Sequence, residues 1–199
     1  MKKNAKTQSK KKAAKSVRKA AGPVEGIKKA VSRVSHLFQD EPQDIADAIK
    51  QDHEALRNFL KLLKDTDEPM AKRRQAYSLF SDLLKSHSKI EESVVYAASD
   101  VYPGRELHIK IAEGYVEHQL ATDLMNRIEK AKDAVTWSAH ANVLSEIVEH
   151  HLKEEERDLL PLIRKAAKLD ADQAMLHAFI AGRERTQVRV EKKNAGVLK

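Results

Sequence analysis

Two short stretches of the 199-residue chain place a histidine and a glutamate four residues apart. The first is HSKIE, from His87 to Glu91, and the second is HLKEE, from His151 to Glu155. In an α-helix, residues four apart lie on the same face, so each stretch aims an imidazole and a carboxylate at one point. Because both groups are metal ligands, each stretch is a candidate half of a metal site.

Two further histidines extend this pattern into a repeat. His53 and His118 lie on apolar stripes of helical spacing and are 65 residues apart, while the two HxxxE stretches are 64 residues apart. A helical hairpin with one histidine followed by HxxxE therefore occurs twice, which predicts a site of approximate two-fold symmetry. The candidate metal ligands are His53, His87, Glu91, His118, His151 and Glu155.

Each of these residues has an ordinary explanation when taken alone. A lone histidine on an apolar stripe is most often a core residue with hydrogen-bond partners, and one His/Glu pair stabilises a helix by about 0.2–0.5 kcal/mol. Six such groups on four core stripes are different, because buried carboxylates without a metal would lack compensation for their charge. The joint pattern therefore favours a metal site.

The ligand types favour particular metals. The chain has no cysteine, which excludes a thiolate zinc site, a cysteine-ligated iron–sulfur cluster and a disulfide framework. Mixed imidazole and carboxylate ligands suit iron or manganese, whereas magnesium and calcium prefer oxygen. We expect two iron ions bridged by the carboxylates, with manganese as the second choice. Open coordination positions would admit O₂, NO or peroxide.

The elements that would position these groups are long helices. Gly (6) and Pro (5) are few in a chain that is 34% charged and 41% apolar, a balance typical of helical proteins. Apolar periodicity predicts bundle helices over residues 43–64, 70–99 and 105–132. A fourth helix is expected to begin at an N-cap, Thr136, and to kink or end near Pro161. The predicted fold class is all-α, an up-down-up-down four-helix bundle.

The segments on either side of this bundle are predicted to differ from it. A short amphipathic helix is expected over residues 24–38, and a short C-terminal helix capped by Asp170 over residues 170–185. The predicted domain organisation has three parts. These are a basic, largely disordered arm with the amphipathic helix over residues 1–41, the bundle over residues 42–168, and a C-terminal helix and tail over residues 169–199.

Positive charge is concentrated at the N-terminus. Residues 1–34 hold 12 Lys and Arg against the single acid Glu25, whereas the other residues are 25 basic and 29 acidic. Such an arm suits contact with nucleic-acid phosphates, but a solvated tail without a partner explains it equally well. Since neither a secretory signal nor a membrane-spanning stretch is found, we expect a cytoplasmic protein without membrane contact.

The other histidines and nearby acids are assigned no ligand role. His150 points about 100° away from His151 on the helix, and Glu92 and Glu156 are expected at the rim of the site. Tyr115, one turn before His118, is the stripe residue with a hydroxyl that could serve the site, although plain packing explains it as well. The histidines assigned to the surface or to packing are His36, His108, His140 and His177.

With these residues in view, the sequence resembles the hemerythrin-like family of HHE cation-binding domains. The resemblance extends over about residues 43–167 and implies a four-helix bundle with a carboxylate-bridged di-iron centre on the same six residues. The matching stretches are QDHEALRNFL around His53, HSKIEE from His87, VEHQLATDLM around His118, and HHLKEEERDLLPLI from His150.

Two positions depart from the oxygen-carrying members of that family. Carriers have a second histidine where this chain has Thr122, and an aspartate where it has Glu155. The pattern is more similar to symmetric bacterial members, which include iron–sulfur repair proteins and iron or oxygen sensors. The cysteine-bearing N-terminal motif of the repair proteins is missing, and the first half-site lacks the proline typical of the family.

The leading functional hypothesis is a non-haem di-iron protein that binds or reacts with O₂, NO or peroxide in sensing, scavenging, stress response or iron handling. The alternative is a nucleic-acid-associated protein in which residues 1–34 localise the metal-binding bundle. A third hypothesis is an enzyme that oxidises an organic substrate at the centre, although no residue identifies a substrate pocket. No catalytic residue is assigned.

Overall fold

The computed structural model describes the backbone of residues 23–197 and the side chains of residues 27–185. Over these residues the chain forms helices and no strand, which confirms the all-α prediction. The predicted disorder of the basic arm falls on residues 1–22, which lie outside the described part. No helix in the described part is both long and apolar enough to cross a bilayer.

The first helical hairpin carries three of the six candidate ligands. Helix α2 (Ile45–Lys64) pairs with α3 (Met70–Ile90), which continues without a break through the π-helical segment η1 (Glu91–Tyr96) and the short α4 (Ala97–Ser99). Helix α2 begins where the Asp44 carboxylate accepts a hydrogen bond from the Asp47 amide at 2.8 Å. The predicted helices over residues 43–64 and 70–99 agree with these bounds to within two residues.

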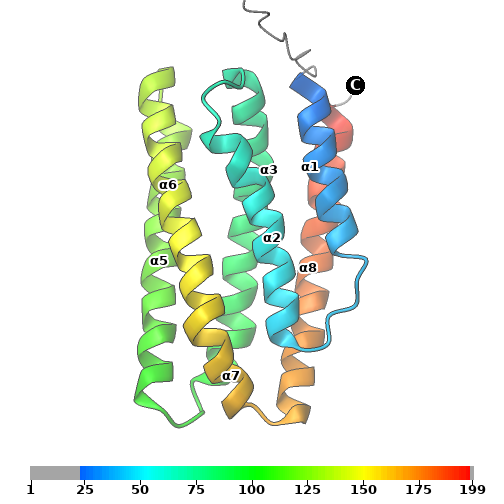
Figure 1. Cartoon of the computed structure of the whole chain (residues 1–199), viewed down its shortest axis with the longest axis vertical. Coiled ribbons are helices and arrows are strands. Elements are labelled where there is room, and N and C mark those ends of the chain that lie inside the picture. The colour runs from blue at the N-terminus through cyan, green and yellow to red at the C-terminus, as the bar shows by residue number, and fades with distance from the viewer. Residues whose placement is uncertain (1–22, 198–199) are drawn as a thin grey trace, which may run out of the picture.

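The second hairpin repeats this arrangement. Helix α5 (Arg105–Lys130) pairs with α6 (Ala134–Glu154), which continues through the π-helical segment η2 (Glu155–Leu159) into α7 (Leu160–Ala166). Figure 1 shows α2, α3, α5 and α6 side by side, with their long axes close to parallel.

Two details of the second hairpin differ from expectation. The N-cap of α6 is Asp133, whose carboxylate accepts a hydrogen bond from the Thr136 amide at 2.8 Å, so the prediction of Thr136 as the cap is wrong. An N-cap side chain must accept a hydrogen bond from a free amide in the first turn of the helix, and the Asp133 carboxylate does so at Thr136. Pro161 does not end the helix, because it lies at the start of α7 directly after the π-helical segment η2, and the helix continues past it to Ala166.

Two flanking helices, α1 (Pro23–Leu37) and α8 (Leu169–Val197), pack on the first hairpin. Helix α1 contacts α2 and α3, as expected for an amphipathic helix, and α8 contacts α2, α3 and η1. The prediction for α8 was wrong in two respects. The helix runs to Val197 rather than to residue 185, and Asp170 lies in its first turn rather than at its cap.

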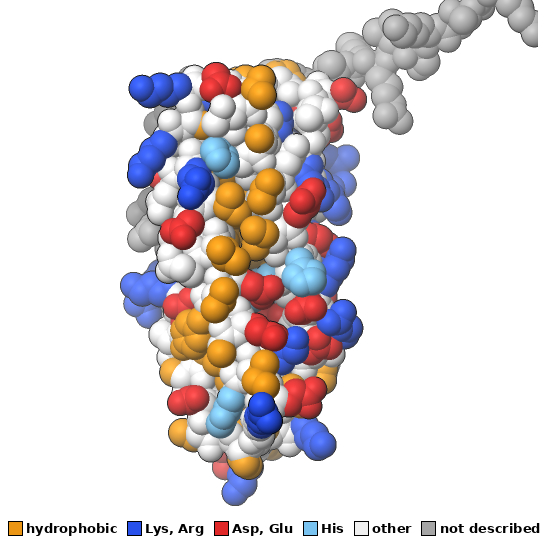
Figure 2. All heavy atoms as spheres, turned by 90° about the vertical axis from the view of Figure 1, so that its left-hand side faces the viewer, with side chains coloured by type: hydrophobic (Ala, Val, Ile, Leu, Met, Phe, Trp, Pro, Cys, Tyr) orange, Lys and Arg blue, Asp and Glu red, His pale blue; other side chains and the backbone are white. Residues whose placement is uncertain are grey.

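The two hairpins differ in how much of their outer surface is covered. Helices α1 and α8 lie on the α2/α3 side, whereas no other helix of residues 23–197 covers the outer face of α5 and α6 (Figure 1). Figure 2 shows apolar side chains running along that open face between charged ones. The exposed large apolar residues of α5 and α6 include Ile109, Val116, Leu120 and Val143.

The core is divided into two apolar clusters. One cluster includes Phe59, Phe80 and Trp137, and the other includes Tyr96 and Phe179. The first cluster contains residues from the middle and the end of α2, and the second cluster contains residues from the beginning of α2. His53 lies between the two clusters along this helix. The polar candidate ligands therefore occupy the layer between two apolar blocks.

Candidate metal centre

The six residues predicted from the sequence lie together inside the bundle. All six are buried, and each long helix of the two hairpins contributes at least one of them. Their donor atoms form two groups in which all atoms lie within 4.8 Å of one another. The inner group comprises His53, His87, Glu91 and Glu155, and the outer group comprises Glu91, His118 and His151.

The distances between donor atoms are short across helices. The Nε2 atoms of His118 and His151 are 3.2 Å apart, and His53 Nε2 is 3.2 Å from an oxygen of Glu155. Glu91 connects the two groups, because its Oε2 lies 3.6 Å from His87 Nε2 and 3.4 Å from His118 Nε2. The two HxxxE stretches thus meet at one place, as their helical spacing predicts.

Each of the four imidazoles is held from behind by a carboxylate. In every case Nδ1 faces that carboxylate and Nε2 faces the centre. The Nδ1 pairs are His53 with Glu156 (2.8 Å), His87 with Asp52 (3.3 Å), His118 with Glu92 (2.8 Å) and His151 with Glu117 (2.7 Å). Because an ionised carboxylate only accepts, Nδ1 carries a proton in these pairs, and in a neutral ring Nε2 presents its lone pair.

These carboxylates follow the repeat of the ligands. Asp52 and Glu117 each precede a lone histidine in the sequence, while Glu92 and Glu156 each follow a ligand glutamate. Sequence reasoning expected Glu92 and Glu156 only at the rim. Their side chains are indeed partly exposed, at 35% and 27%, but both bind a histidine of the opposite hairpin.

Buried atoms without partners show that the residues fit a bound cation. Among the described side chains, buried donor and acceptor atoms that make no hydrogen bond include His53 Nε2, His87 Nε2, Glu91 Oε1 and Glu155 Oε2. These four belong to the four residues of the inner group. Burying such atoms unpaired costs free energy, and a cation between them would offset that cost.

Burial and neighbouring charge shift the pKa values of Glu91 and Glu155 in opposite directions. Burial, with the charge of Glu155 beside it, raises the pKa of Glu91 well above its ordinary value. Burial acts in the same direction on Glu155, but contacts with His53 and His151 outweigh it and lower the pKa of Glu155. Two adjacent carboxyls in a buried site therefore share one proton when no cation is present.

The histidines respond to the same environment. Burial, reinforced by the ring of His151, lowers the pKa of His118 to about 3, so this imidazole is neutral at pH 7, as a metal ligand must be. Burial also disfavours the protonated form of His53, but contacts with Glu155 and Glu156 raise its pKa. A cation bound at the centre would compete with that proton.

A family comparison agrees with this geometry. The model of the hemerythrin HHE cation-binding domain matches residues 44–163, more than half of the chain. The chain belongs to this family. Neither a search of curated proteins nor a search of solved structures found a significant match. Helices α1 and α8 lie outside the matched residues, so they are additions to the HHE domain of this chain.

Sequence reasoning missed Tyr96, which lies inside the HHE domain next to both glutamates. Its hydroxyl is 3.3 Å from an oxygen of Glu91 and 3.2 Å from an oxygen of Glu155, and its ring stacks on His118 at 5.8 Å between centroids. In a regular α-helix, residues five apart point in different directions. The wider turn of η1 brings Tyr96 over Glu91, and periodicity gives no signal of that change.

The backbone makes room for this hydroxyl at Gly114 on α5. A Cβ atom at Gly114 would lie 2.4 Å from the Tyr96 hydroxyl oxygen, well inside van der Waals contact. Tyr115, the residue considered from the sequence, is 42% exposed and packs edge-on against the Tyr96 ring at 5.2 Å. Tyr96 is therefore the phenol that serves the HHE site, and Tyr115 supports it from outside.

The remaining histidines lie away from the centre. His150 forms an i, i+4 pair with Glu154 just as His151 does with Glu155, but its side chain is 66% exposed and faces outward. His36, His108 and His177 are exposed as well. The direction of the helix face, rather than the HxxxE spacing, therefore distinguishes His151 from His150.

Proposed function

We propose that this HHE protein binds two iron ions through His53, His87, Glu91, His118, His151 and Glu155, and that its function is to bind or react with O₂, NO or peroxide. The proposal is supported by one observation above all: buried donor atoms of a His₄Glu₂ set converge from both hairpins, and four of these residues each have one such atom without a hydrogen-bond partner. We further infer the up-down-up-down chain direction of HHE bundles for the four helices that carry these residues.

Iron is favoured by the chemistry of the donors. The set contains imidazole nitrogen and carboxylate oxygen without sulfur, which suits iron or manganese better than zinc, calcium or magnesium. Bound iron would supply open coordination positions and a change of oxidation state. Manganese is the second choice, because it accepts the same ligands.

The residues of this chain would prepare the site for that chemistry. The carboxylates behind the imidazoles fix the ring orientation and the tautomer, which increases the basicity of the ligand nitrogen. The Tyr96 hydroxyl can donate a hydrogen bond to one of the two glutamates, and its stacked ring keeps water from one side of His118. Apolar clusters on both sides keep bulk solvent away from the layer.

Metal analysis with an absorption spectrum before and after exposure to air tests the proposal. We expect two irons per chain and a visible band that appears on oxidation. His118→Ala should lose one iron, whereas His36→Ala, an exposed histidine on α1, should keep both. His151→Ala and His150→Ala form a second matched pair of adjacent residues. Equal iron content within both pairs would refute the ligand assignment.

A further inference from the structure

A further group of metal-ligand atoms lies at the surface, next to the buried centre. Its members are Glu117, His150 and Glu154, here called the mouth group, and their donor atoms lie within 4.8 Å of one another. Their side chains are 20%, 66% and 27% exposed, so solvent reaches them, unlike the six buried ligands. One imidazole and two carboxylates are the same kinds of donor that the buried centre offers, and they suit a divalent cation.

Glu117 connects the mouth group to the centre. One oxygen of its carboxylate lies 2.7 Å from His151 Nδ1, and a carboxylate has a second oxygen that a cation can contact. His150 is the neighbour of His151 in the sequence, but its Nε2 lies 3.5 Å from an oxygen of Glu154 at the surface. The two adjacent histidines of α6 therefore belong to two different groups of donors, one outside and one inside.

A small cavity lies between the mouth group and the centre. Its volume is about 10 Å³, and its lining includes Glu117 and Glu154 of the mouth group together with His151 and Glu155 of the centre. The Glu155 side chain is only 2% exposed, and its Oε2 has no hydrogen-bond partner among the described residues and lies 3.6 Å from His151 Nε2. A cation that leaves the mouth group through this cavity therefore meets a buried acceptor without a donor.

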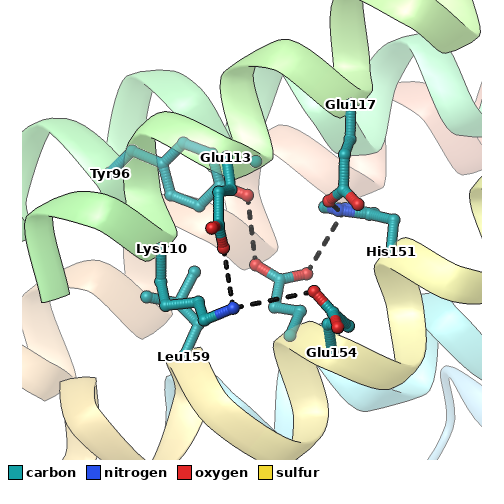
Figure 3. Close-up of a pocket in the computed structure, with 9 residues that line it drawn as sticks. Tyr96, Lys110, Glu113, Glu117, His151, Glu154 and Leu159 are labelled. Atoms are coloured by element: carbon teal, nitrogen blue, oxygen red, sulfur yellow. Dashed lines mark hydrogen bonds and ion pairs between the residues drawn. The ribbon is translucent and has the colours of Figure 1, made fainter. Parts of the chain in front are cut away.

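Acidic side chains outnumber basic ones around the mouth of the cavity, by four to two. They are Glu113, Glu117, Glu154 and Asp158 against Lys110 and Arg157. The Lys110 ammonium lies 2.7 Å from Glu113 and 3.6 Å from Glu154, and Figure 3 shows it between these two carboxylates. The mouth thus already holds one cationic group, and its excess of negative charge attracts a metal cation that competes with Lys110 for Glu154.

A wider hollow beside His118 suits a cation less well. Its volume is about 450 Å³, and its charged lining residues are Lys85, Lys89 and Glu92. Glu92 is already bound to His118 Nδ1 at 2.8 Å, so this hollow lacks the excess of carboxylates found at the mouth. The small cavity has room for one water-sized particle, so a hydrated cation must exchange water for side-chain donors before it moves inward. The mouth group supplies such donors.

We propose that Glu117, His150 and Glu154 form a surface binding site for a divalent metal cation, and that iron(II) enters the buried centre through this site. A cation held there keeps water on its remaining coordination positions, because the side chains are open to solvent. The next donors along the cavity are His151 and Glu155. The entry role rests on the proposed function, since it requires a centre that takes up iron, whereas the surface site itself does not.

A crystal structure of the full-length, iron-loaded protein soaked in Mn²⁺ tests the surface site, because anomalous scattering distinguishes manganese from iron. We expect Mn²⁺ in contact with His150 and Glu154, and the Lys110 ammonium displaced from Glu154. A mouth group without Mn²⁺ would overturn the inference, whatever the centre holds. A centre without iron would instead overturn the proposed function, and Mn²⁺ at the mouth would then still support the surface site.

The rate of iron uptake tests the entry role. Metal-free full-length protein is mixed with iron(II) without air, uptake is stopped with a chelator at set times, and the retained iron is measured. His150→Ala and Glu154→Gln should each load roughly tenfold more slowly but reach the same final iron content.

A charge change of the opposite sign separates an entry site from a merely structural one. Lys110→Gln removes the competing ammonium, so it should load faster than the unmodified sequence. His108→Ala and Glu146→Gln, exposed on α5 and α6, are the matched controls and should load at the unmodified rate. Unchanged rates in His150→Ala and Glu154→Gln, or slower loading of Lys110→Gln, would overturn the entry role.

Discussion

The Nδ1 atom of His151 lies 2.7 Å from a carboxylate oxygen of Glu117, and this contact directs the Nε2 atom of the same ring to the buried centre. Glu117 is the only carboxylate of this kind on α5, and its side chain is 20% exposed. Such a contact adjusts a histidine ligand, because it fixes both the ring orientation and the position of the proton.

Removing the Glu117 carboxylate should weaken metal binding by the outer group, to which His151 belongs. In Glu117→Ala, the His151 ring loses its partner, and we expect the affinity for iron(II) to fall by about 10- to 100-fold. A competition titration against a chelator measures this change. Glu113→Ala, one turn earlier on α5, removes a side chain that is 49% exposed and bound to Lys110, so it serves as the control. Equal affinities of the two variants would show that Glu117 does not position His151.

The periodicity of the sequence was sufficient to bring the six candidate ligands together. The face of a helix that turns inward depends on the local spacing of apolar residues. The apolar stripes therefore predict the inward direction of the four histidines, His53, His87, His118 and His151. The contacts behind the rings are different, because Glu92 and Glu156 reach across to the opposite hairpin. Such pairings depend on how two helices pack, which no single helix pattern contains.

Tyr96 and α8 show two further limits of sequence reasoning. The π-helical turn at η1 changes the direction of Tyr96 without any residue type that marks it. The contact between the Phe179 and His87 rings depends on α8 lying against α3, and an apolar residue on a terminal helix gives no indication of its partner. The direction of Tyr96 and the position of α8 both depend on tertiary packing rather than on local propensity.

The fit between Gly114 and Tyr96 predicts a pair of substitutions that are not additive. Gly114→Ala places a methyl group against the Tyr96 hydroxyl, and we expect this overpacking to cost about 1–3 kcal/mol of unfolding free energy. Tyr96→Phe removes the hydroxyl, so the double variant should recover part of that cost. Urea unfolding of the four proteins measures the interaction. Strict additivity would mean that the two residues do not press on each other.

Bound cations should stabilise the protein, because the unpaired donors gain partners. At a free iron(II) concentration of 100 times Kd, binding contributes about 2.7 kcal/mol per site, which corresponds to a rise in Tm of roughly 5–10 °C. A chelator should reverse the rise. Glu91→Gln should lose most of it, because Glu91 belongs to both groups. Glu146→Gln, exposed on α6, should keep it.

The start of α2 provides a pH-dependent prediction outside the metal centre. Asp44 accepts two hydrogen bonds from Arg164, at 2.7 and 2.8 Å, and one from the Asp47 amide. Partial burial would raise the pKa of Asp44, but these hydrogen bonds outweigh it and hold the pKa below the ordinary 3.8. The ionised form is therefore favoured by folding, and its contribution is present above pH 3.8 and lost as the pH falls through the lower folded pKa.

Asn and Ala at this position separate the charge from the cap. Asp44→Asn keeps a side-chain acceptor for the helix start but loses the ion pair, which is worth no more than about 1 kcal/mol at a partly exposed site. Asp44→Ala loses both and should cost about 1 kcal/mol more. Urea unfolding of the metal-free proteins at several pH values measures the difference between Asp and Asn. That difference should shrink as the pH falls below about 4, and a difference that grows toward acid would show that the Asp44 carboxylate is not stabilised by folding.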